Sequence, residues 1–516
     1  MDMGTQNKRL KSAGNLESFR FSRQQQIDSS KNIEDRRKLG QFSTPFTLAK
    51  EIAQFGISLL GDEEINFLEP AFGTGVFYSA LSEMVDDIKH FSASGFEIDR
   101  DYYNVAAETW KNNNIEIFNA DFLNSEVPSE KYNFVLTNPP YVRHQLIPKE
   151  QKSFLKKLVK KEQGIDISGL AGLYCYFLLL ADKWLADGAV CGWLLPCEFM
   201  DVNYGVALKE YLLNKVHLLR IHRYDSEDSQ FNDALVSSCV VWFKKEKIFK
   251  DYDISFSYGG THKNPGKLTV LKKSQVEQIK KWTHITDDNA VKQTSNPNNV
   301  PVIGDYFDIK RGIATGDNKF FILNREQISR FNLDMNFFQP ILPSPRNMKQ
   351  NEIRADENGN PEIEEPLYLL NCNLSEEIIK KNYPDLWNYL QKGTETTAQK
   401  YLCKNRKRWY SQEQRTPTAF LCSYMGRGTE DSMPFRFILN HSKAIASNSY
   451  LLLYPKDNLK ELLHNEQDYQ RVWGALQAIT THDIESEGRI YGGGLKKIEP
   501  KELAKVKCIN LQSALT

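Results

Sequence analysis

The residues 138-NPPY-141 stand directly behind a short apolar run, 134-FVLT-137, and their types suit one kind of chemistry. Proline fixes φ and has no backbone N–H, so two consecutive prolines make a rigid turn. The side-chain oxygen of Asn138 and the carbonyl oxygen of Pro139 are two acceptors, which match the two hydrogens of an NH₂ group. Holding both hydrogens draws the nitrogen lone pair out of conjugation with an aromatic ring, so the amine becomes nucleophilic. We predict that Asn138, Pro139, Pro140 and Tyr141 form a catalytic turn. Tyr141 would stack on the aromatic ring that carries the amine.

A glycine-containing turn precedes this motif in the segment 67-FLEPAFGTGVFYSAL-81. The pattern predicts a strand, a tight turn with Gly73 and Gly75, and a helix whose N-terminal N–H groups face a ligand. The glycine spacing fits neither the dinucleotide pattern G-x-G-x-x-G nor a P-loop. Taken alone, the segment is explained equally well as an ordinary strand-to-helix turn.

Acidic residues follow the next two predicted strands, in 96-FEID-99 and 119-NADF-122. Glu97 can accept both hydroxyls of a ribose, as acids do at this place in nucleotide-binding folds. Asp121 can accept from an exocyclic adenine amine, and Phe122 can stack on the ring. Each acid alone could be a solvated strand end or a helix cap. Four motifs at the carboxyl ends of four successive strands favour a ligand site, because open α/β sheets bind ligands there.

Alternating short apolar runs and amphipathic stretches between about residues 40 and 245 predict the elements that position these motifs. They indicate an α/β fold with a doubly wound, mostly parallel sheet, in which the last two runs form an antiparallel edge pair. Residues 1–35 are polar, and we expect a flexible or helical arm there. We place the first domain at 36–260, a connecting segment at 261–300 and a second, α+β domain at 301–516.

The composition limits the classes of protein that need to be considered. Lys+Arg and Asp+Glu both number 66, so any nucleic-acid site has to be a local patch. The eight cysteines are scattered and form no C-x-x-C, which indicates buried reduced thiols in a cytoplasmic protein and no metal site. We find no signal peptide, and no apolar run approaches about 18 residues, so we expect no membrane segment.

The motifs 40-GQFSTP-45, 69-EPAFGTG-75, 97-EID-99, 120-ADF-122 and 138-NPPY-141 occur in this order. In order and in type they resemble the gamma-class, TaqI-like N6-adenine DNA methyltransferases of bacterial restriction–modification systems. The resemblance implies a seven-stranded methyltransferase sheet, S-adenosylmethionine as donor, double-stranded DNA as substrate, and a second domain that recognises the target sequence. A methyl group on a sulfonium is also the electrophile that suits the amine described above, because it leaves a neutral thioether and requires no strong base.

The resemblance also assigns individual residues. It implies that Phe231, in 231-FNDALVSSCVVWF-243, packs on an adenine that has been flipped out of the duplex. It implies a donor site that consists of Thr44, Pro45, Glu69, Pro70, Ala71, Gly73, Gly75, Glu97, Ile98, Asp121 and Phe122.

A basic cluster with interleaved aromatic residues, 400-KYLCKNRKRWYSQEQR-415, is the candidate DNA contact in the second domain. Lys404, Arg406, Lys407 and Arg408 are suited to phosphate contacts. A solvated helix face or loop is the alternative.

Three other functions compete with a DNA-protecting methyltransferase. An N-methyltransferase acting on RNA or on protein glutamine could use the same turn. A non-catalytic DNA-binding defence subunit could keep the fold. A fused restriction enzyme would need a nuclease domain, for which residues 1–35 are too few. We expect a monomer whose cognate restriction endonuclease shares the target site without having to bind the methyltransferase.

Overall fold

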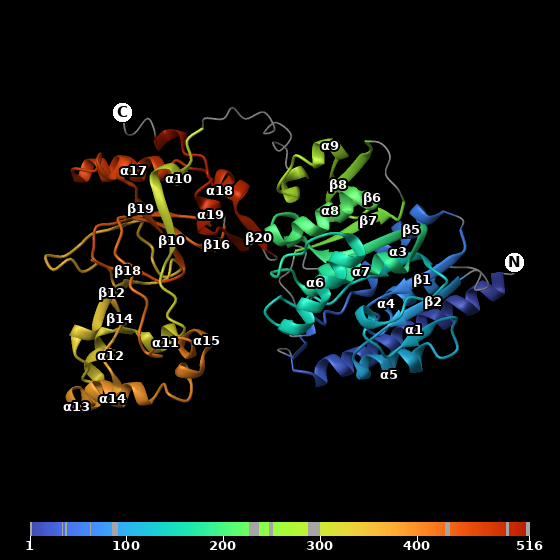
Figure 1. Ribbon diagram of the computed structural model, residues 1–516, viewed down its shortest axis with the longest axis horizontal. Helices are drawn as coiled ribbons and strands as arrows, with labels where there is room; N and C mark the ends of the chain where they lie inside the picture. The colour runs from blue at the N-terminus through green and yellow to red at the C-terminus, as the bar shows by residue number, and fades with distance from the viewer. Residues whose placement is uncertain are drawn as a thin grey trace. The chain divides into compact units, whose positions relative to one another are not determined.

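The computed structural model describes residues 3–32, 35–36, 39–61, 63–84, 91–225, 237–246, 251–286, 300–428, 434–491 and 495–511, without the side chains of 3–15, 482, 490 and 491. The chain divides into two compact units, residues 1–295 with 491–493 and residues 296–490 with 494–516 (Figure 1). The two units are described separately. Among the described residues, no helix combines the length and the apolar character that crossing a membrane requires.

The first unit is built on a nine-stranded sheet in the order β3-β2-β1-β4-β5-β7-β6-β8-β9. Neighbours from β3 to β5 are parallel, and β7 is antiparallel to both β5 and β6. Parallel strands covered on both faces need almost continuous apolar sequence, which the central strands have. The strands are β1 (Ile65–Glu69), β2 (Phe91–Phe96), β3 (Glu116–Phe118), β4 (Tyr132–Thr137), β5 (Leu185–Pro196), β6 (His217–Arg223), β7 (Ser238–Lys244), β8 (Asp253–Gly260) and β9 (Pro265–Lys272).

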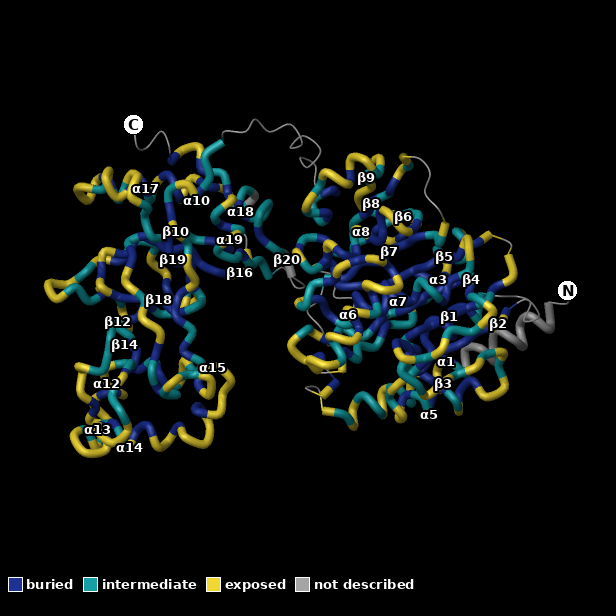
Figure 2. Tube along the Cα trace, in the orientation of Figure 1, coloured by how far each residue is buried: buried dark blue, intermediate teal, exposed yellow. Residues whose placement is uncertain are grey.

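Helices cover both faces of this sheet, as Figure 2 shows by the dark, buried strands between partly exposed helices. One apolar core joins the sheet to α3 (Phe46–Leu60), α4 (Val76–Ser82) and α5 (Arg100–Thr109). The other joins it to α6 (Lys149–Gln163), α7 (Leu173–Ala181) and α8 (Val206–Asn214). A short helix, α9 (Lys273–Val276), follows β9. The chain winds outward from β1 through β2 to β3 and returns to β4, so the strand order reverses between β1 and β4, where ligands bind in such sheets.

The predicted doubly wound α/β class is confirmed, with three differences in extent. The sheet has nine strands where seven were expected, because β8 and β9 extend it beyond β6. The antiparallel pair of β6 and β7 therefore lies inside the sheet and not at its edge. Strand β9 belongs to the sheet although we expected residues 261–300 to connect two domains. The expected arm contains a long helix, α1 (Met3–Ser30), that packs on α4 and α5.

The second unit has an α+β architecture, as expected, with sheets in the orders β10-β19-β15-β17-β13, β11-β14-β12-β18 and β16-β21-β20. The strands are β10 (Phe307–Arg311), β11 (Ile322–Asn324), β12 (Phe338–Leu342), β13 (Glu352–Ile353), β14 (Leu367–Leu370), β15 (Phe420–Ser423), β16 (Met425–Arg427), β17 (Phe437–Asn440), β18 (Ile445–Ala446), β19 (Tyr450–Pro455), β20 (Arg489–Tyr491) and β21 (Leu495–Lys497). The helices are α10 (Ile303–Tyr306), α11 (Asn318–Phe321), α12 (Arg325–Arg330), α13 (Glu376–Asn382), α14 (Pro384–Gln391), α15 (Tyr401–Lys404), α16 (Asp457–Lys460), α17 (Glu466–Gln477), α18 (Thr481–Glu487) and α19 (Pro500–Leu503).

Candidate active site

A cavity of about 500 Å³ lies at the carboxyl ends of β1, β2 and β4, where the strand order reverses. This is large enough for a ligand of nucleotide size. Most of the residues that sequence analysis assigned to the donor and to the catalytic turn line this one cavity. They are Thr44, Glu69, Pro70, Ala71, Gly73, Glu97, Ile98, Asp121, Phe122, Asn138 and Pro140.

The glycine turn packs tightly behind the cavity. Gly75 has φ 87° and caps α4, and a Cβ there would lie 2.4 Å from the Phe72 ring. The backbone N–H of Gly73 donates to Glu97 Oε2 at 2.8 Å, and the N–H of Asp99 donates to Glu97 Oε1 at 2.8 Å. These bonds fix the Glu97 carboxyl, whose oxygens each keep a lone pair for a further donor. Burial raises the pKa of Glu97 to about 7, although the two N–H groups act to lower it.

Glu69, at the end of β1, carries a buried oxygen that has no partner. Its side chain is 1% exposed, and its Oε2 accepts no hydrogen bond from the described residues. Burial holds the pKa of this carboxyl well above its usual range. An unpaired buried carboxyl is costly, and a cationic group entering the cavity would relieve that cost.

The other predicted donor residues line the cavity in different ways. Ile98 is 68% exposed, an unusual state for a large apolar side chain, whereas Phe122 is buried. The Phe122 ring packs on Phe177, with centroids 5.7 Å apart. A ligand ring that contacts Phe122 in the cavity would extend this aromatic stack. Asp121 accepts from the N–H of Leu123 at 3.0 Å, which is the capping role that sequence analysis left open.

Asn138 has a fixed orientation that leaves one acceptor free. Its Nδ2 donates to Thr44 Oγ1 at 3.0 Å and to the carbonyl oxygen of Phe42 at 3.3 Å. A carbonyl oxygen only accepts, so the NH₂ group and not the amide oxygen must face Phe42. The amide oxygen Oδ1 is buried and accepts no hydrogen bond from the described residues. Asn138 therefore keeps an acceptor that has no partner among the described residues, and its predicted role toward an amine stays a prediction.

The segment that carries Thr44 packs directly on the catalytic turn. The N–H of Tyr141 donates to the carbonyl oxygen of Gly40 at 3.3 Å, and Gly40 has φ 67°. The Tyr141 hydroxyl donates to the carbonyl oxygen of Leu194 at 3.1 Å, and its ring lies 5.8 Å from the Phe42 ring. Burial raises the pKa of Tyr141, which keeps the phenol neutral. Pro45 caps α3 behind this contact. Phe231 lies outside the described residues.

The basic cluster of the second unit is only partly available for a partner. Lys404 and Lys407 are exposed. Arg406 instead donates from Nη2 to the carbonyl oxygen of Ala314 at 2.7 Å and lies over the Phe321 ring. The guanidinium of Arg406 thus holds two segments of the unit together, and Arg408 is half-buried.

Sequence analysis missed residues of α1 and its surroundings that belong to the cavity. Gln24, Gln41, Asp99 and Tyr102 line it. Gln24 comes from the segment that we described only as a polar arm. Its four-residue spacing to Arg20 and Asp28, on one face of a helix, is the signal that could have drawn attention to it.

Replacing Gly40 by alanine tests whether the contact between the two segments is as tight as described. A Cβ on Gly40 would lie 2.4 Å from the Tyr141 nitrogen, in a left-handed backbone conformation. Gly164 has a similar φ of +72° but open space around it, so Gly164→Ala is the matched control for backbone strain alone. In urea unfolding we expect Gly164→Ala to lose about 1 kcal/mol and Gly40→Ala about 3 kcal/mol or more. Equal losses would contradict the close approach.

Comparison with known proteins bears on the identity of this site. A family model described as Eco57I restriction-modification methylase matches residues 46–231, and one described as the C-terminal domain of Type II methyltransferase M.Eco57I matches residues 280–515. Type II methyltransferase M.AccI of Acinetobacter calcoaceticus is 28% identical over 94% of this chain and 88% of its own length. M.XamI of Xanthomonas campestris pv. amaranthicola is 25% identical over 73% of this chain and 67% of its own length.

Among solved structures, the Type IIL restriction-modification enzyme MmeI in complex with DNA aligns with a TM-score of 0.50 and 13% identity. The alignment covers 94% of this chain and 70% of that one, and at this identity the likeness concerns the fold. The two family models lie one in each unit for nearly all of their lengths. The chain therefore belongs to the Eco57I-type methyltransferases of restriction–modification systems, which confirms the gamma-class resemblance of its motifs.

Proposed function

We propose that the protein transfers a methyl group from S-adenosylmethionine to the N6 amine of an adenine flipped out of double-stranded DNA. Membership of the restriction–modification methyltransferases supports a DNA methyltransferase and implies S-adenosylmethionine as its donor. The choice of adenine, the flipping and the roles of single residues belong to the proposal. The methylated site would be protected from a cognate restriction endonuclease, and we propose that the methyltransferase acts as a monomer.

One observation carries the proposal: two buried oxygens without described partners, Asn138 Oδ1 and Glu69 Oε2, belong to residues that line the same cavity. The neutral amide oxygen suits a neutral amine, and the carboxyl suits a cation. S-adenosylmethionine supplies an activated methyl group on a sulfonium and carries an ammonium group, a ribose and an adenine ring. In the proposal Glu69 accepts from the ammonium group, Glu97 accepts from the ribose hydroxyls, and Ile98 and Phe122 contact the adenine ring.

On the substrate side, Asn138 Oδ1 and the carbonyl oxygen of Pro139 would accept the two hydrogens of the target amine. This removes the nitrogen lone pair from conjugation, so that it can form the N–C bond while the S–C bond breaks. The methylated nitrogen then loses a proton to solvent. Tyr141 and Phe231 would enclose the base, because a flipped base needs stacking to recover the few kcal/mol that unpairing costs.

Parallel transfer assays test this function against its rivals. With radiolabelled donor, we expect label in double-stranded DNA and none in RNA or protein. Label in RNA or protein alone would favour the alternative N-methyltransferases, and no transfer to any of the three would favour a non-catalytic DNA-binding subunit.

Asn138→Ala should separate chemistry from donor binding. The substitution removes an acceptor whose hydrogen bond to the target amine is stronger in the transition state than in the bound substrate. We therefore expect kcat to fall by about two orders of magnitude or more. The dissociation constant of S-adenosylmethionine, measured by calorimetry, should change by less than about threefold. An equal loss of donor affinity would contradict the assignment of Asn138 to the target amine.

Donor affinity should depend on pH through Glu97. Its pKa of about 7 means that the neutral carboxyl prevails below neutral pH and the carboxylate above it. Hydroxyl groups bond more strongly to a carboxylate, so affinity should rise with pH through about 7 and level off above it. Calorimetry from about pH 6 to about pH 8.5 measures this, and Glu97→Gln is the control in which the dependence should be lost. The same pH profile in both proteins would rule out this role.

In the second unit we propose that Lys404 and Lys407, and Arg408 in part, contact DNA phosphates. Replacing Lys404 and Lys407 by glutamine should weaken DNA binding and reduce the slope of log K against log salt by about 0.9 for each lost contact. The control is Lys380→Gln with Lys381→Gln, an equal charge loss on the exposed end of α13. Arg406→Gln should lower the melting temperature, because Arg406 is bonded to Ala314. Equal effects of the two double variants would remove the cluster from the DNA interface.

A further inference from the structure

Helix α1 carries a polar stripe that faces the cavity. Arg20, Gln24 and Asp28 follow one another at spacings of four, which places them along one side of the helix, and Lys31 comes directly after its last residue, Ser30. Among the side chains of residues 16–30, only those of Glu17 and Arg20 are buried, while Phe19 and Phe21 are exposed. The described part of α1 is thus held mainly by polar contacts and not by an apolar face. The question is what these contacts hold in place.

The first set of contacts reaches the glycine turn. Arg20 is 2% exposed and pairs with Glu17, with Nη2 2.6 Å from Oε1. Its Nη1 also donates to Thr74 Oγ1 at 2.7 Å, and Glu17 accepts from Ser79 Oγ at 2.6 Å. A buried ion pair with these additional hydrogen bonds is satisfied on both sides, so it anchors α1 to the turn that lines the cavity.

The second set reaches the segment that orients Asn138. Gln24 Nε2 donates to Ser43 Oγ at 2.8 Å, and Ser43 Oγ donates to Asp28 Oδ2 at 2.8 Å. The next residue, Thr44, accepts the hydrogen bond from Asn138. Gln24 also accepts from Thr74 Oγ1, so this one side chain connects the glycine turn with the Thr44 segment.

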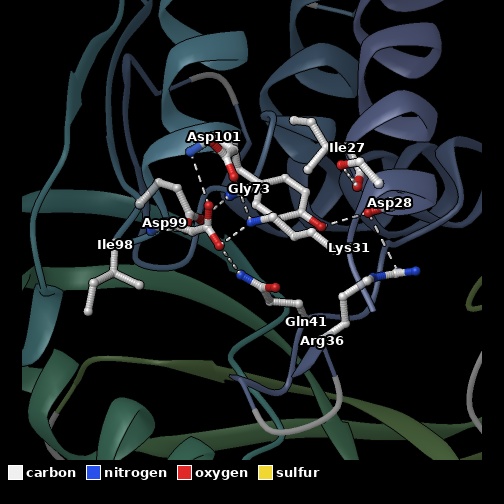
Figure 3. A network of polar contacts seen from close by, with 12 residues as sticks. Ile27, Asp28, Lys31, Arg36, Gln41, Gly73, Ile98, Asp99 and Asp101 are labelled. Carbon is white, nitrogen blue, oxygen red and sulfur yellow. Dashed lines mark hydrogen bonds and ion pairs between the residues drawn. The ribbon is translucent and has the colours of Figure 1, made fainter. Parts of the chain in front are cut away.

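The third set lies beside Glu97. Lys31 Nζ is 2.5 Å from Asp99 Oδ2 and 3.2 Å from Asp101 Oδ2, and it lies 4.6 Å from the centre of the Tyr102 ring (Figure 3). Gln41 donates to the same Asp99 oxygen at 2.8 Å. Burial, the largest single influence, raises the pKa of Asp99, but the hydrogen bonds from Lys31 and Gln41 and the charge of Lys31 together outweigh it, so the pKa is lowered. Figure 3 shows Ile98 pointing away from this network.

Asp99 links this cation to the predicted ribose acceptor. Its backbone N–H donates to Glu97 Oε1 at 2.8 Å, and its side chain caps α5. Lys31 and Asp99 are 20% and 13% exposed, so the pair is shielded from water and from salt screening. Losing the ammonium would leave a partly buried carboxylate whose other described side-chain donor is Gln41, and the backbone around Glu97 would be free to shift.

We propose that α1 forms one wall of the methyl-donor site and that Lys31 is a positioning residue for the donor, acting through Asp99 on Glu97. This rests on the proposed placement of S-adenosylmethionine in the cavity. It gives residues 17–31 of the predicted arm a role in donor binding. It also explains what holds the described part of α1, in which no apolar side chain is buried: its partners are the glycine turn, the Thr44 segment and the loop after β2.

The test is calorimetric binding of S-adenosylmethionine to the full-length protein without DNA. Lys31→Met should raise the donor dissociation constant about tenfold, and Lys31→Arg, which keeps the charge, should stay within about threefold of the natural protein. The matched control is Arg23→Met in α1, the helix that Lys31 directly follows. Arg23 also pairs with a carboxylate of α5, Glu108 at 3.4 Å, but on the exposed side. Arg23→Met should leave donor affinity unchanged. At saturating donor, kcat of Lys31→Met should remain within about twofold.

Unchanged donor affinity in Lys31→Met, or an equal loss in Arg23→Met, would overturn the inference. If Lys31→Met lowers the melting temperature of the free protein, the variant Gln41→Leu is used in its place. Gln41→Leu removes the other side-chain hydrogen bond to Asp99 Oδ2. Its donor dissociation constant should rise in the same direction, and an unchanged value would overturn the inference. Failure of the natural protein to bind the donor would instead contradict the proposed donor site itself, so the two failures are distinguishable.

Discussion

The hydrogen bonds from the Asn138 amide to Phe42 and Thr44 are the interaction on which the rest of the site depends. They orient the side chain so that its oxygen stays unpaired in a buried wall. Leaving an acceptor buried without a partner costs about 1–3 kcal/mol, and a fold keeps it only where the surroundings fix it. The surroundings here are the close contact of Gly40 with Tyr141 and the end of the buried strand β4. The open acceptor is therefore a property of the folded chain and does not require a ligand to create it.

The opposite side of the cavity is governed by electrostatics. Glu69 and Glu97 are both buried, burial raises the pKa of each carboxyl, and the nearby charge of Glu97 raises the pKa of Glu69 further. A cationic ligand with hydroxyl groups is the partner that best relieves both carboxyls. Lys31 pairs with Asp99, in the loop after β2, and is not among the residues that line the cavity. Its charge therefore neutralises Asp99 and leaves Glu69 and Glu97 for a cationic ligand. In the proposed function, donor recognition and target activation would therefore use different buried oxygens, which belong to residues of one cavity.

Local patterns allowed most of the site to be predicted, and the failures have a common physical cause. Strand-turn-helix motifs such as 67–81 depend on backbone geometry within a few residues, so the strand, the turn at Gly75 and the helix could be predicted from sequence. Some contacts of α1 join polar residues more than fifty positions apart, such as Arg20 with Thr74, and no local pattern encodes them. Arg406 looked like a free cation because sequence does not show that Ala314 offers it a carbonyl oxygen. Strands β8 and β9 were missed for a different reason: few of their residues are buried, with only Leu271 buried in β9, so they contain no continuous apolar run.

The identity of the methylated atom tests the central claim most directly. An unpaired amide oxygen at the catalytic turn can activate an exocyclic amine but offers nothing to a ring carbon. DNA methylated in vitro with a donor carrying a deuterated methyl group can be digested to nucleosides and measured by mass spectrometry. The account predicts the label on the N6 amine of adenine, with loss of that product in Asn138→Ala. Label on carbon 5 of cytosine would contradict the role of Asn138, and label on the N4 amine of cytosine would contradict the choice of adenine.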